Sequence, residues 1–328
     1  ADGDFGGGLG ATDVVHSYAA FREVRVAPDA SGVMRVHLNG TPIFLRGVLS
    51  QGYWPDGLMT APADAAFAAD IRAMRDAGFN LLRTHIKVEA ERFYYLCDAL
   101  GMLVWQDMPS GGGQAKALRT MVLPTLFTGS WWHYSDTVPT NWISLGAANA
   151  RYRKLWRDTC ERTVSRLANH PCIIAWVLFN ESWGQFDAGK ATQMVWDLDP
   201  ARPVASASGW YDQGTGDIRG IHNYFRGIHL FDDPYAGQRS QGGRAQMMTE
   251  FGGLTWRVEG HSSLDHSYGY AELSSLEEWR NALHELLAQA DALEGQGLAG
   301  FVYTQLTDVE EETNGILRSE ERRVGKEC

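Results

Sequence analysis

Eight short apolar runs, several of them followed by a helical pattern, constrain the fold of this chain more than any other feature of its sequence. The run IIAWVLF (173–179) is apolar at every position, as expected of a strand that is buried on both faces. Such strands, separated by helices, form a parallel sheet, and eight units over about 250 residues match a (β/α)8 barrel. The predicted strands are 43–48, 80–86, 102–107, 173–179, 203–208, 217–224, 245–251 and 298–306.

Helical patterns at 63–77, 91–100, 148–168 and 274–293 separate several of these strands. The third has an apolar stripe at the spacing of one helix face: Tyr152, Leu155, Trp156, Cys160, Val164 and Leu167. A doubly wound open sheet would show the same alternation, but no glycine-rich phosphate-binding fingerprint follows a strand here. We therefore predict an α/β TIM barrel over residues 39–317.

The first 38 residues combine a glycine-rich start with β patterns. ADGDFGGGLG is typical of a linker, and MRVHL (34–38) is a predicted strand. Asn39-Gly40 is a strong two-residue hairpin turn that leads into the first barrel strand. We interpret 1–38 as a linker and the last strands of a preceding β domain.

The segment RSEERRVGKEC (318–328) has Val324 as its only aliphatic residue, and we interpret it as a truncated or non-native tail. A barrel of this kind normally closes with a helix on its last strand. Without that helix, we expect the outer faces of Leu298, Phe301 and Val302 to be exposed and the chain to be poorly soluble.

Composition excludes several function classes. The formal net charge of −11 argues against nucleic acid or anionic membranes as partners, since both repel negative charge. No apolar run approaches the roughly 18 residues of a membrane span. The four cysteines form no CxxC pair, which argues against a zinc ribbon or a dithiol redox motif. A soluble protein is expected, in the cytoplasm or exported.

Two glutamates follow apolar strands, at the end of a barrel where active sites lie. Glu181 follows 173–179 after one intervening residue, Asn180, within FNESWGQFD, and Glu250 ends MMTE. Two carboxylates about 5–5.5 Å apart can flank a glycosidic bond, one as nucleophile and the other as acid and then base. The alternative is that each glutamate caps a helix or pairs with a structural arginine. Other strand-end residues are Arg83, His85, Trp105, Asp107, Asn180, Trp210, His222, Asn223, Tyr224, Tyr303 and Gln305.

Longer motifs around these positions resemble glycoside hydrolase family 2, which holds β-galactosidases, β-glucuronidases and β-mannosidases. RLANHPCIIAWVLFNESWG (166–184) is similar to the family's acid/base segment, and MTEFGG (248–253) to its nucleophile strand. Similar segments in order are NGTPIFLRGV (39–48), GFNLLRTH (78–85), LCDALGMLVWQDMP (96–109) and LAGFVYTQLTDVEEETNGIL (298–317). The resemblance covers residues 33–317.

This resemblance implies roles for individual residues. Glu181 would be the general acid/base and Glu250 the nucleophile. The implied substrate-binding residues are Asn180 on the sugar 2-hydroxyl, Arg83 and Tyr224 beside Glu250, and His85, Trp183 and Tyr303 against the sugar. It also implies that a sandwich domain and an immunoglobulin-like domain precede the barrel, with 1–38 as the tail of the second.

Aromatic residues suggest where a sugar would stack, because indole faces pack on the apolar face of a pyranose. Among the 12 tryptophans, Trp54, Trp105, Trp183, Trp210 and Trp256 fall near predicted strand ends, whereas Trp156, Trp176 and Trp196 are expected in the core. The segment 110–147 is too long for an ordinary connection. It either builds subsites at the barrel mouth or packs against preceding domains.

The sequence thus predicts a retaining β-glycosidase that acts on a β-galactoside, β-glucuronide or β-mannoside, without an organic cofactor. No metal-binding residues are assigned, and a metal requirement is left open. Its expected partner is the carbohydrate substrate, and homo-oligomer formation is left open. One alternative is an endo-acting retaining glucanase or mannanase. Another is a non-catalytic carbohydrate-binding barrel, against which the two opposed carboxylates argue.

Overall fold

The computed structural model describes residues 14, 16–236, 243–259, 264 and 266–317, and its centre is a closed barrel of eight parallel strands. The predicted TIM barrel is confirmed. Strand β13 closes the ring by pairing with β4, where Tyr303 lies opposite Val48. In the order of the ring the strands are β4 (Leu45–Ser50), β5 (Leu81–Thr84), β6 (Leu103–Asp107), β7 (Ile173–Asn180), β8 (Val204–Ser208), β9 (Ile218–Asn223), β10 (Ala245–Gly252) and β13 (Leu298–Thr304).

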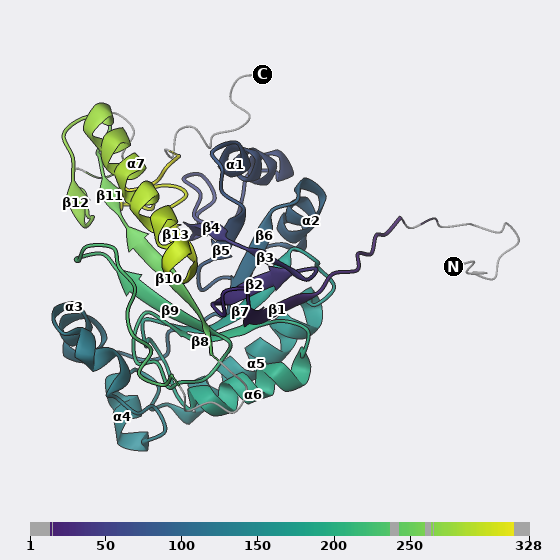
Figure 1. Cartoon of the computed structure of the whole chain (residues 1–328), viewed down its shortest axis with the longest axis vertical. Helices are drawn as coiled ribbons and strands as arrows, with labels where there is room; N and C mark the ends of the chain where they lie inside the picture. The colour runs from purple at the N-terminus through teal and green to yellow at the C-terminus, as the bar shows by residue number, and fades with distance from the viewer. Residues whose placement is uncertain (1–13, 15, 237–242, 260–263, 265, 318–328) are drawn as a thin grey trace, which may run out of the picture.

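Five longer helices lie around the outside of these strands (Figure 1). They are α1 (Asp64–Asp76), α2 (Glu91–Leu100), α5 (Ala150–Leu167), α6 (Ala188–Leu198) and α7 (Leu276–Ala292). Four of them match predicted helices, and α6 does not. Its buried face consists of Ala188, Ala191, Thr192 and Val195, small side chains that give little apolar periodicity to detect. In the described parts of the connections that follow β8 and β9, no helix is present.

Alternating side chains fill the inside of the barrel, so it is a packed core and not a pore. Leu49, Leu81, Trp105, Val177 and Val302 belong to one buried interior cluster. The opposite faces of the strands pack against the surrounding helices in a second, larger cluster. The buried cysteines Cys97, Cys160 and Cys172 belong to this outer cluster as packing residues.

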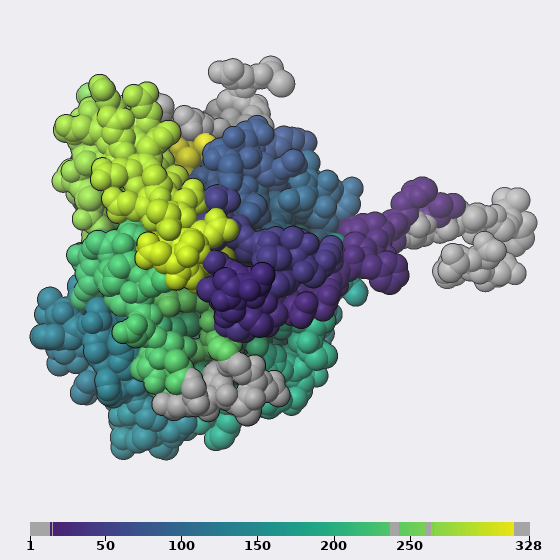
Figure 2. Space-filling view, viewed as in Figure 1, coloured from purple at the N-terminus to yellow at the C-terminus, as the bar shows by residue number. Residues whose placement is uncertain are grey.

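A small antiparallel sheet lies against the barrel, and it consists of β1 (Val24–Pro28), β2 (Met34–Leu38) and β3 (Thr41–Ile43). Val24 and Val36 join the interior cluster, and Figure 2 shows this N-terminal segment over the middle of one face. Arg35 donates to the backbone oxygens of Glu294 and Leu298, at the start of β13. The sheet therefore covers the end of the barrel where the strands begin. Its membership of a preceding domain stays a prediction.

The predicted exposure of the last strand is wrong. Leu298, Phe301 and Val302 are at most 1% exposed. Val302 points into the barrel, and the Phe301 ring lies 5.8 Å from that of Phe44 and 5.4 Å from that of Phe251. Helix α7 packs its Leu283 into the same outer cluster, so the helix before β13 helps to cover this face. The residues of the predicted tail, 318–328, lie outside the described residues.

The long segment 110–147 forms four short helical pieces at the periphery (Figure 1, lower left). They are η1 (Leu118–Val122), α3 (Leu123–Leu126), η2 (Thr128–Trp132) and α4 (Pro139–Ser144). The remaining elements are the short pair β11 (Leu254–Thr255) and β12 (Ala271–Glu272), and η3 (Glu294–Gln296). Among the described residues, no helix has the length and apolar character needed to cross a bilayer.

Candidate active site

Glu181 lies directly after β7 in an unusual backbone conformation. Its φ is 47° and that of Ser182 is 63°, both in the left-handed region that non-glycine residues seldom adopt. The Glu181 N–H donates to the backbone oxygen of Ser208 at 2.8 Å, which fixes this turn to the end of β8. Strained residues of this kind cluster at functional sites, where the surrounding structure holds them in place.

A bulge in β10 points Glu250 into the barrel. The pairing of β10 with β9 shifts register between Met248 and Glu250, which leaves Thr249 as an extra residue. Met247 is an interior residue, so plain alternation would place Thr249 inside and Glu250 outside. Because of the extra residue, both Thr249 and Glu250 face inward. Bulges often re-aim a side chain beside an active site in this way.

Arg83, at the end of β5, holds three strand ends together from a fully buried position. Its guanidinium binds both carboxylate oxygens of Asp107, at 3.0 and 2.8 Å. It also donates to Glu250 Oε1 at 3.0 Å and to Asn180 Oδ1 at 2.8 Å. A planar guanidinium suits several acceptors in one plane, so Arg83 fixes the position of Glu250.

Tyr224 supplies the second hydrogen bond to Glu250. Its hydroxyl donates to Glu250 Oε2 at 2.6 Å and lies 2.8 Å from Thr304 Oγ1. The Tyr224 ring stacks on that of Tyr270, with 3.8 Å between ring centroids. Each oxygen of Glu250 thus accepts a hydrogen bond from the protein, and the ring that carries the phenol is held by a second aromatic ring.

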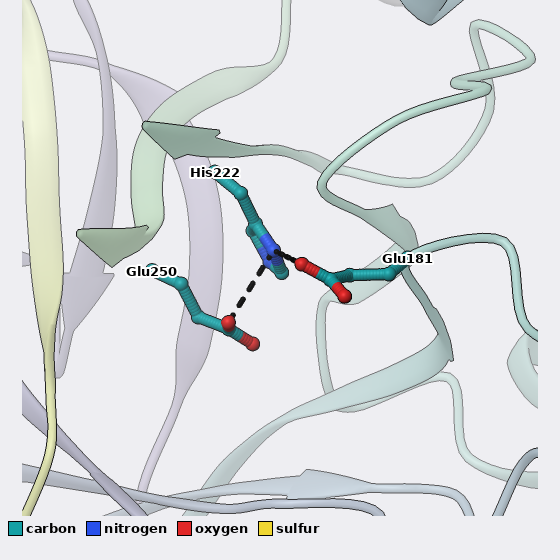
Figure 3. A group of neighbouring side chains, drawn as sticks. All are labelled: Glu181, His222 and Glu250. Atoms are coloured by element: carbon teal, nitrogen blue, oxygen red, sulfur yellow. Dashed lines mark hydrogen bonds and ion pairs between the residues drawn. The ribbon is translucent and has the colours of Figure 1, made fainter. Parts of the chain in front are cut away.

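His222 lies between the two glutamates (Figure 3). Its Nδ1 is 2.9 Å from Glu181 Oε1 and 3.4 Å from Glu250 Oε2, and its Nε2 is 2.8 Å from Ser208 Oγ. One carboxylate oxygen of Glu181 and one of Glu250 lie within 4.8 Å of each other. This bound on one pair of oxygens lies near the roughly 5–5.5 Å between the carboxyl groups of retaining enzymes, whereas those of inverting enzymes are roughly 6.5–9.5 Å apart.

Burial controls the protonation of Glu181, Glu250 and His222. It raises the pKa of Glu181 to about 7, partly opposed by the charge of Arg83. Burial also raises the pKa of Glu250, while His222, Arg83 and the Tyr224 hydrogen bond lower it. Burial lowers the pKa of His222 to about 4, so its imidazole is neutral near pH 7. A neutral Nδ1 can accept the proton of Glu181 while Nε2–H donates to Ser208.

Two of the predicted sugar contacts lie where a ligand could reach them. The His85 side chain is 16% exposed, with Nδ1 3.7 Å from Asp107 Oδ2 and 3.8 Å from Glu250 Oε1. Trp183 is 36% exposed, two residues after Glu181. A cavity opens beside Glu181, and Trp183 is not among the residues that line it. A sugar contact for either residue stays a prediction.

Tyr303 does not face the site. Its side chain is fully buried in the outer cluster, and its ring lies 5.9 Å from that of Phe251. Alternation along β13 places Val302 and Thr304 inside the barrel, so Thr304 is the residue that reaches Tyr224. The expectation that Tyr303 contacts a sugar is therefore wrong by one position along the strand.

The cavity beside Glu181 has a volume of about 120 Å³, and half of its lining residues are aromatic. Of the five tryptophans predicted near strand ends, Trp210 lines it, whereas Trp54 and Trp105 are buried in the core. The expected core residues Trp156 and Trp176 are buried. The cavity is lined by Met121, Pro124, Thr125, Trp131, Glu181, Trp210, His222, Tyr224, Phe225, Arg226, Tyr268 and Tyr270.

Several of these residues were outside the sequence-based site. His222 was noted only as a strand-end residue. It lies two positions before Tyr224, and residues two apart on a strand point to the same side, so this spacing could have placed His222 in the site. Trp131 comes from the long segment 110–147, which therefore contributes to the mouth of the barrel. Tyr268 and Tyr270 come from the connection after β10, where no sequence pattern marks them.

Glu181, His222 and Glu250 could also hold a metal ion, since three of their ligand atoms lie within 4.8 Å of one another. A carboxylate–histidine set of this kind suits zinc or another transition metal. The same atoms are those that acid–base chemistry at a glycosidic bond would use.

Comparisons with known proteins agree with the fold. Residues 33–230 match the family model for Glycosyl hydrolases family 2, TIM barrel domain. A β-galactosidase of Leuconostoc mesenteroides is 27% identical over 187 residues, which cover 55% of this chain and 15% of that protein. A β-galactosidase of Klebsiella pneumoniae is 29% identical over 203 residues, covering 60% and 16%. The matched part therefore spans 15–16% of the length of these two relatives.

Solved structures share the architecture at low sequence identity. A GH2 β-galacturonidase from Eisenbergiella tayi bound to galacturonate has a TM-score of 0.62 at 18% identity, and the match covers 91% of this chain and 51% of that one. A β-D-glucuronidase of Dictyoglomus thermophilum has a TM-score of 0.64 at 14% identity, covering 92% and 51%. At these identities the likeness shows the fold.

Proposed function

The chain belongs to glycosyl hydrolase family 2, and we propose that it carries the active site of a retaining β-glycosidase that removes terminal sugars by double displacement. The observation that carries this proposal is the separation of the two carboxylates. Glutamate oxygens within 4.8 Å of each other leave room for the anomeric carbon, but not for an additional water in line between nucleophile and sugar.

In the first step, Glu250 attacks the anomeric carbon. The bond between that carbon and the leaving oxygen breaks, and the leaving oxygen takes the proton of Glu181. Arg83 and Tyr224 hold the two oxygens of Glu250 in place, which reduces the entropy lost on reaching the attack geometry. The products of this step are a covalent glycosyl-enzyme and the free leaving group.

In the second step, the Glu181 carboxylate removes a proton from water. The water oxygen attacks the anomeric carbon, and the bond to Glu250 breaks. Two inversions give a sugar with retained configuration. A pKa of about 7 suits Glu181 for both steps, because such a group can give and take a proton near neutral pH. We assign Asn180, whose Oδ1 accepts a hydrogen bond from Arg83, to the sugar 2-hydroxyl.

The sugar we propose to test first is a β-galactoside, since the curated relatives are named β-galactosidases. A β-glucuronide would need a cation for its carboxylate, and the guanidinium of Arg83 is already occupied by Asp107, Glu250 and Asn180. A β-mannoside differs from a β-galactoside in configuration at both the 2- and the 4-hydroxyl, and the first of these is the group assigned to Asn180.

The test is to follow hydrolysis of 4-nitrophenyl β-galactoside, β-glucuronide and β-mannoside by proton NMR. The first anomer released should be the β-anomer, seen before mutarotation. Release of the α-anomer first would mean inversion and would contradict the double-displacement proposal. Failure to hydrolyse any of the three substrates would contradict the assignment as a glycosidase of terminal sugars.

A further inference from the structure

The cavity beside Glu181 has a different chemical character from the surroundings of Glu250. Six of its lining side chains are aromatic: Trp131, Trp210, Tyr224, Phe225, Tyr268 and Tyr270. They come from four separate parts of the chain, namely the 110–147 segment and the connections that follow β8, β9 and β10. Arg226 is the only arginine or lysine among the residues that line this cavity.

The reaction geometry assigns this cavity to the leaving group. In each displacement the leaving group departs on the side of the anomeric carbon opposite to the nucleophile. The proton donor must lie against the leaving oxygen, so the attached group extends past Glu181 and away from Glu250. Glu181 lines the cavity and Glu250 does not. This step of the inference rests on the proposed function.

The walls of the cavity are fixed before any ligand binds. The indole N–H of Trp210 donates to the backbone oxygens of Glu181 and Thr120, each at 3.1 Å. The indole N–H of Trp131 donates to the Pro124 oxygen at 2.9 Å. Arg226 donates to the Thr125 oxygen and lies over the Trp131 ring, 5.8 Å from its centroid. Pre-positioned rings lose little freedom when a flat ligand enters.

Several polar groups that line the cavity already bond within the protein, among them both ring nitrogens of His222 and one Arg226 nitrogen. Both indole N–H groups are already used, and the Tyr224 hydroxyl donates to Glu250. A pyranose leaving group carries several hydroxyls, and burying each of them without a hydrogen-bond partner costs binding free energy. A benzene-type ring has no such groups, and aromatic walls attract it by stacked or edge-to-face contacts.

We propose that this cavity is an aglycone site that selects a single aromatic ring, so that the preferred substrates are aryl β-glycosides. Its volume of about 120 Å³ compares with the engineered apolar cavity of about 150 Å³ that takes up benzene. The guanidinium of Arg226 adds a cation–π contact to a ring bound beside it. Phe225 and Tyr268, which are 56% and 48% exposed, form the rim that the ring passes.

The experiment measures binding of free phenol, cyclohexanol and glucose by proton NMR titration, without any need for turnover. We expect phenol to bind at least about 5-fold more tightly than cyclohexanol, from the aromatic contacts. Glucose should be weaker still, because several polar groups of the cavity already bond within the protein and can satisfy only part of its hydroxyls. Phenol binding no tighter than cyclohexanol or glucose would overturn the proposal.

Two rim variants, Phe225→Ala and Tyr268→Ala, connect this binding to catalysis. Each should lower kcat/KM about 5- to 10-fold for a phenyl β-glycoside and less than about 2-fold for the methyl β-glycoside of the same sugar. The control is Tyr95→Ala, a tyrosine of similar exposure on α2, which should change neither. Equal losses on both substrates would overturn the aryl preference.

The two proposals fail in distinguishable ways. If phenol binds as expected and the protein hydrolyses no β-glycoside, the glycosidase assignment fails, and the role of the cavity as an aglycone site fails with it, while its aromatic selectivity stands. If glycosides are hydrolysed with retention but phenol has no advantage, the glycosidase assignment stands and the aromatic site is overturned.

Discussion

The two sides of this site differ in how their side chains are held. On the side of Glu250, Arg83, Asp107 and Asn180 come from the ends of barrel strands and are linked by short hydrogen bonds within a buried network. On the side of the cavity, aromatic residues come from connections between strands, and Phe225 and Tyr268 are about half exposed. Charged contacts fix the first side, whereas ring packing shapes the second.

This difference separates the parts that perform the reaction from the parts that choose the substrate. A nucleophile must be held to within a fraction of an ångström, and strand ends in a packed barrel provide that rigidity. Loops tolerate substitution without loss of the barrel, so they are suited to set which leaving group is accepted. Substitutions on the strand-end side should therefore have larger effects than those on the loop side.

The largest effect should come from Glu250→Ala. Without the nucleophile no glycosyl-enzyme can form, and we expect kcat to fall by at least about 10⁴-fold. Added azide should restore part of the activity and give a glycosyl azide of inverted configuration, because azide then attacks in place of the carboxylate. Glu272→Ala, which removes an exposed glutamate from β12, is the control and should retain activity. A fall of less than about 10-fold for Glu250→Ala would refute its assignment.

Glu181→Gln should have the next largest effect. General acid catalysis contributes about 10²–10⁴-fold, so alkyl β-glycosides should lose that factor, whereas 4-nitrophenyl glycosides should lose far less in the first step. In the unmodified protein, kcat/KM should fall as pH rises through about 7, since Glu181 then loses the proton that it must donate. For Glu181→Gln this alkaline fall should be absent. An unchanged pH profile in the variant would show that another group is the acid.

Much of the strand-end side could be predicted from the sequence. Apolar runs of strand length located the ends of β5, β6 and β7, and the barrel rule then indicated Arg83, Asp107 and Glu181. The inward direction of Glu250 depends on the bulge at Thr249, which no local pattern indicates. Tyr303 shows the same limit, because a shift of one residue along a strand reverses the face on which a side chain lies.

Apart from Trp210 and Tyr224, little of the loop side could be predicted. Trp131, Tyr268 and Tyr270 lie in connections without periodicity, so their position depends on tertiary packing alone. Composition pointed to aromatic residues as a class, yet Trp54 and Trp105 proved to be core residues. The stack of Tyr270 on Tyr224 joins residues 46 positions apart and has no signal within either segment.

Arg83→Met tests whether the charged network also stabilises the barrel. The variant leaves Asp107 and Glu250, whose side chains are 2% and 6% exposed, without their shared cation. Breaking a buried pair in this way costs about 3–5 kcal/mol, and we expect the free energy of unfolding in urea to fall by that amount. Arg92→Met breaks the exposed pair of Arg92 with Asp64 and should leave it almost unchanged. Equal losses in both variants would mean that Arg83 is no more important to stability than a surface arginine.

The smallest effect should come from removing metal ions. Glu181, His222 and Glu250 could bind a cation, but a cation on Glu181 would stabilise its ionised form and so oppose the protonation that the first step needs. We therefore expect kcat/KM to be the same, within error, before and after dialysis against EDTA. Added zinc should inhibit, and inhibition should weaken in His222→Asn, which lacks the imidazole ligand. Loss of activity on chelation that one metal restores would contradict a reaction carried by the two carboxylates alone. It would mean that a metal ion takes part in catalysis.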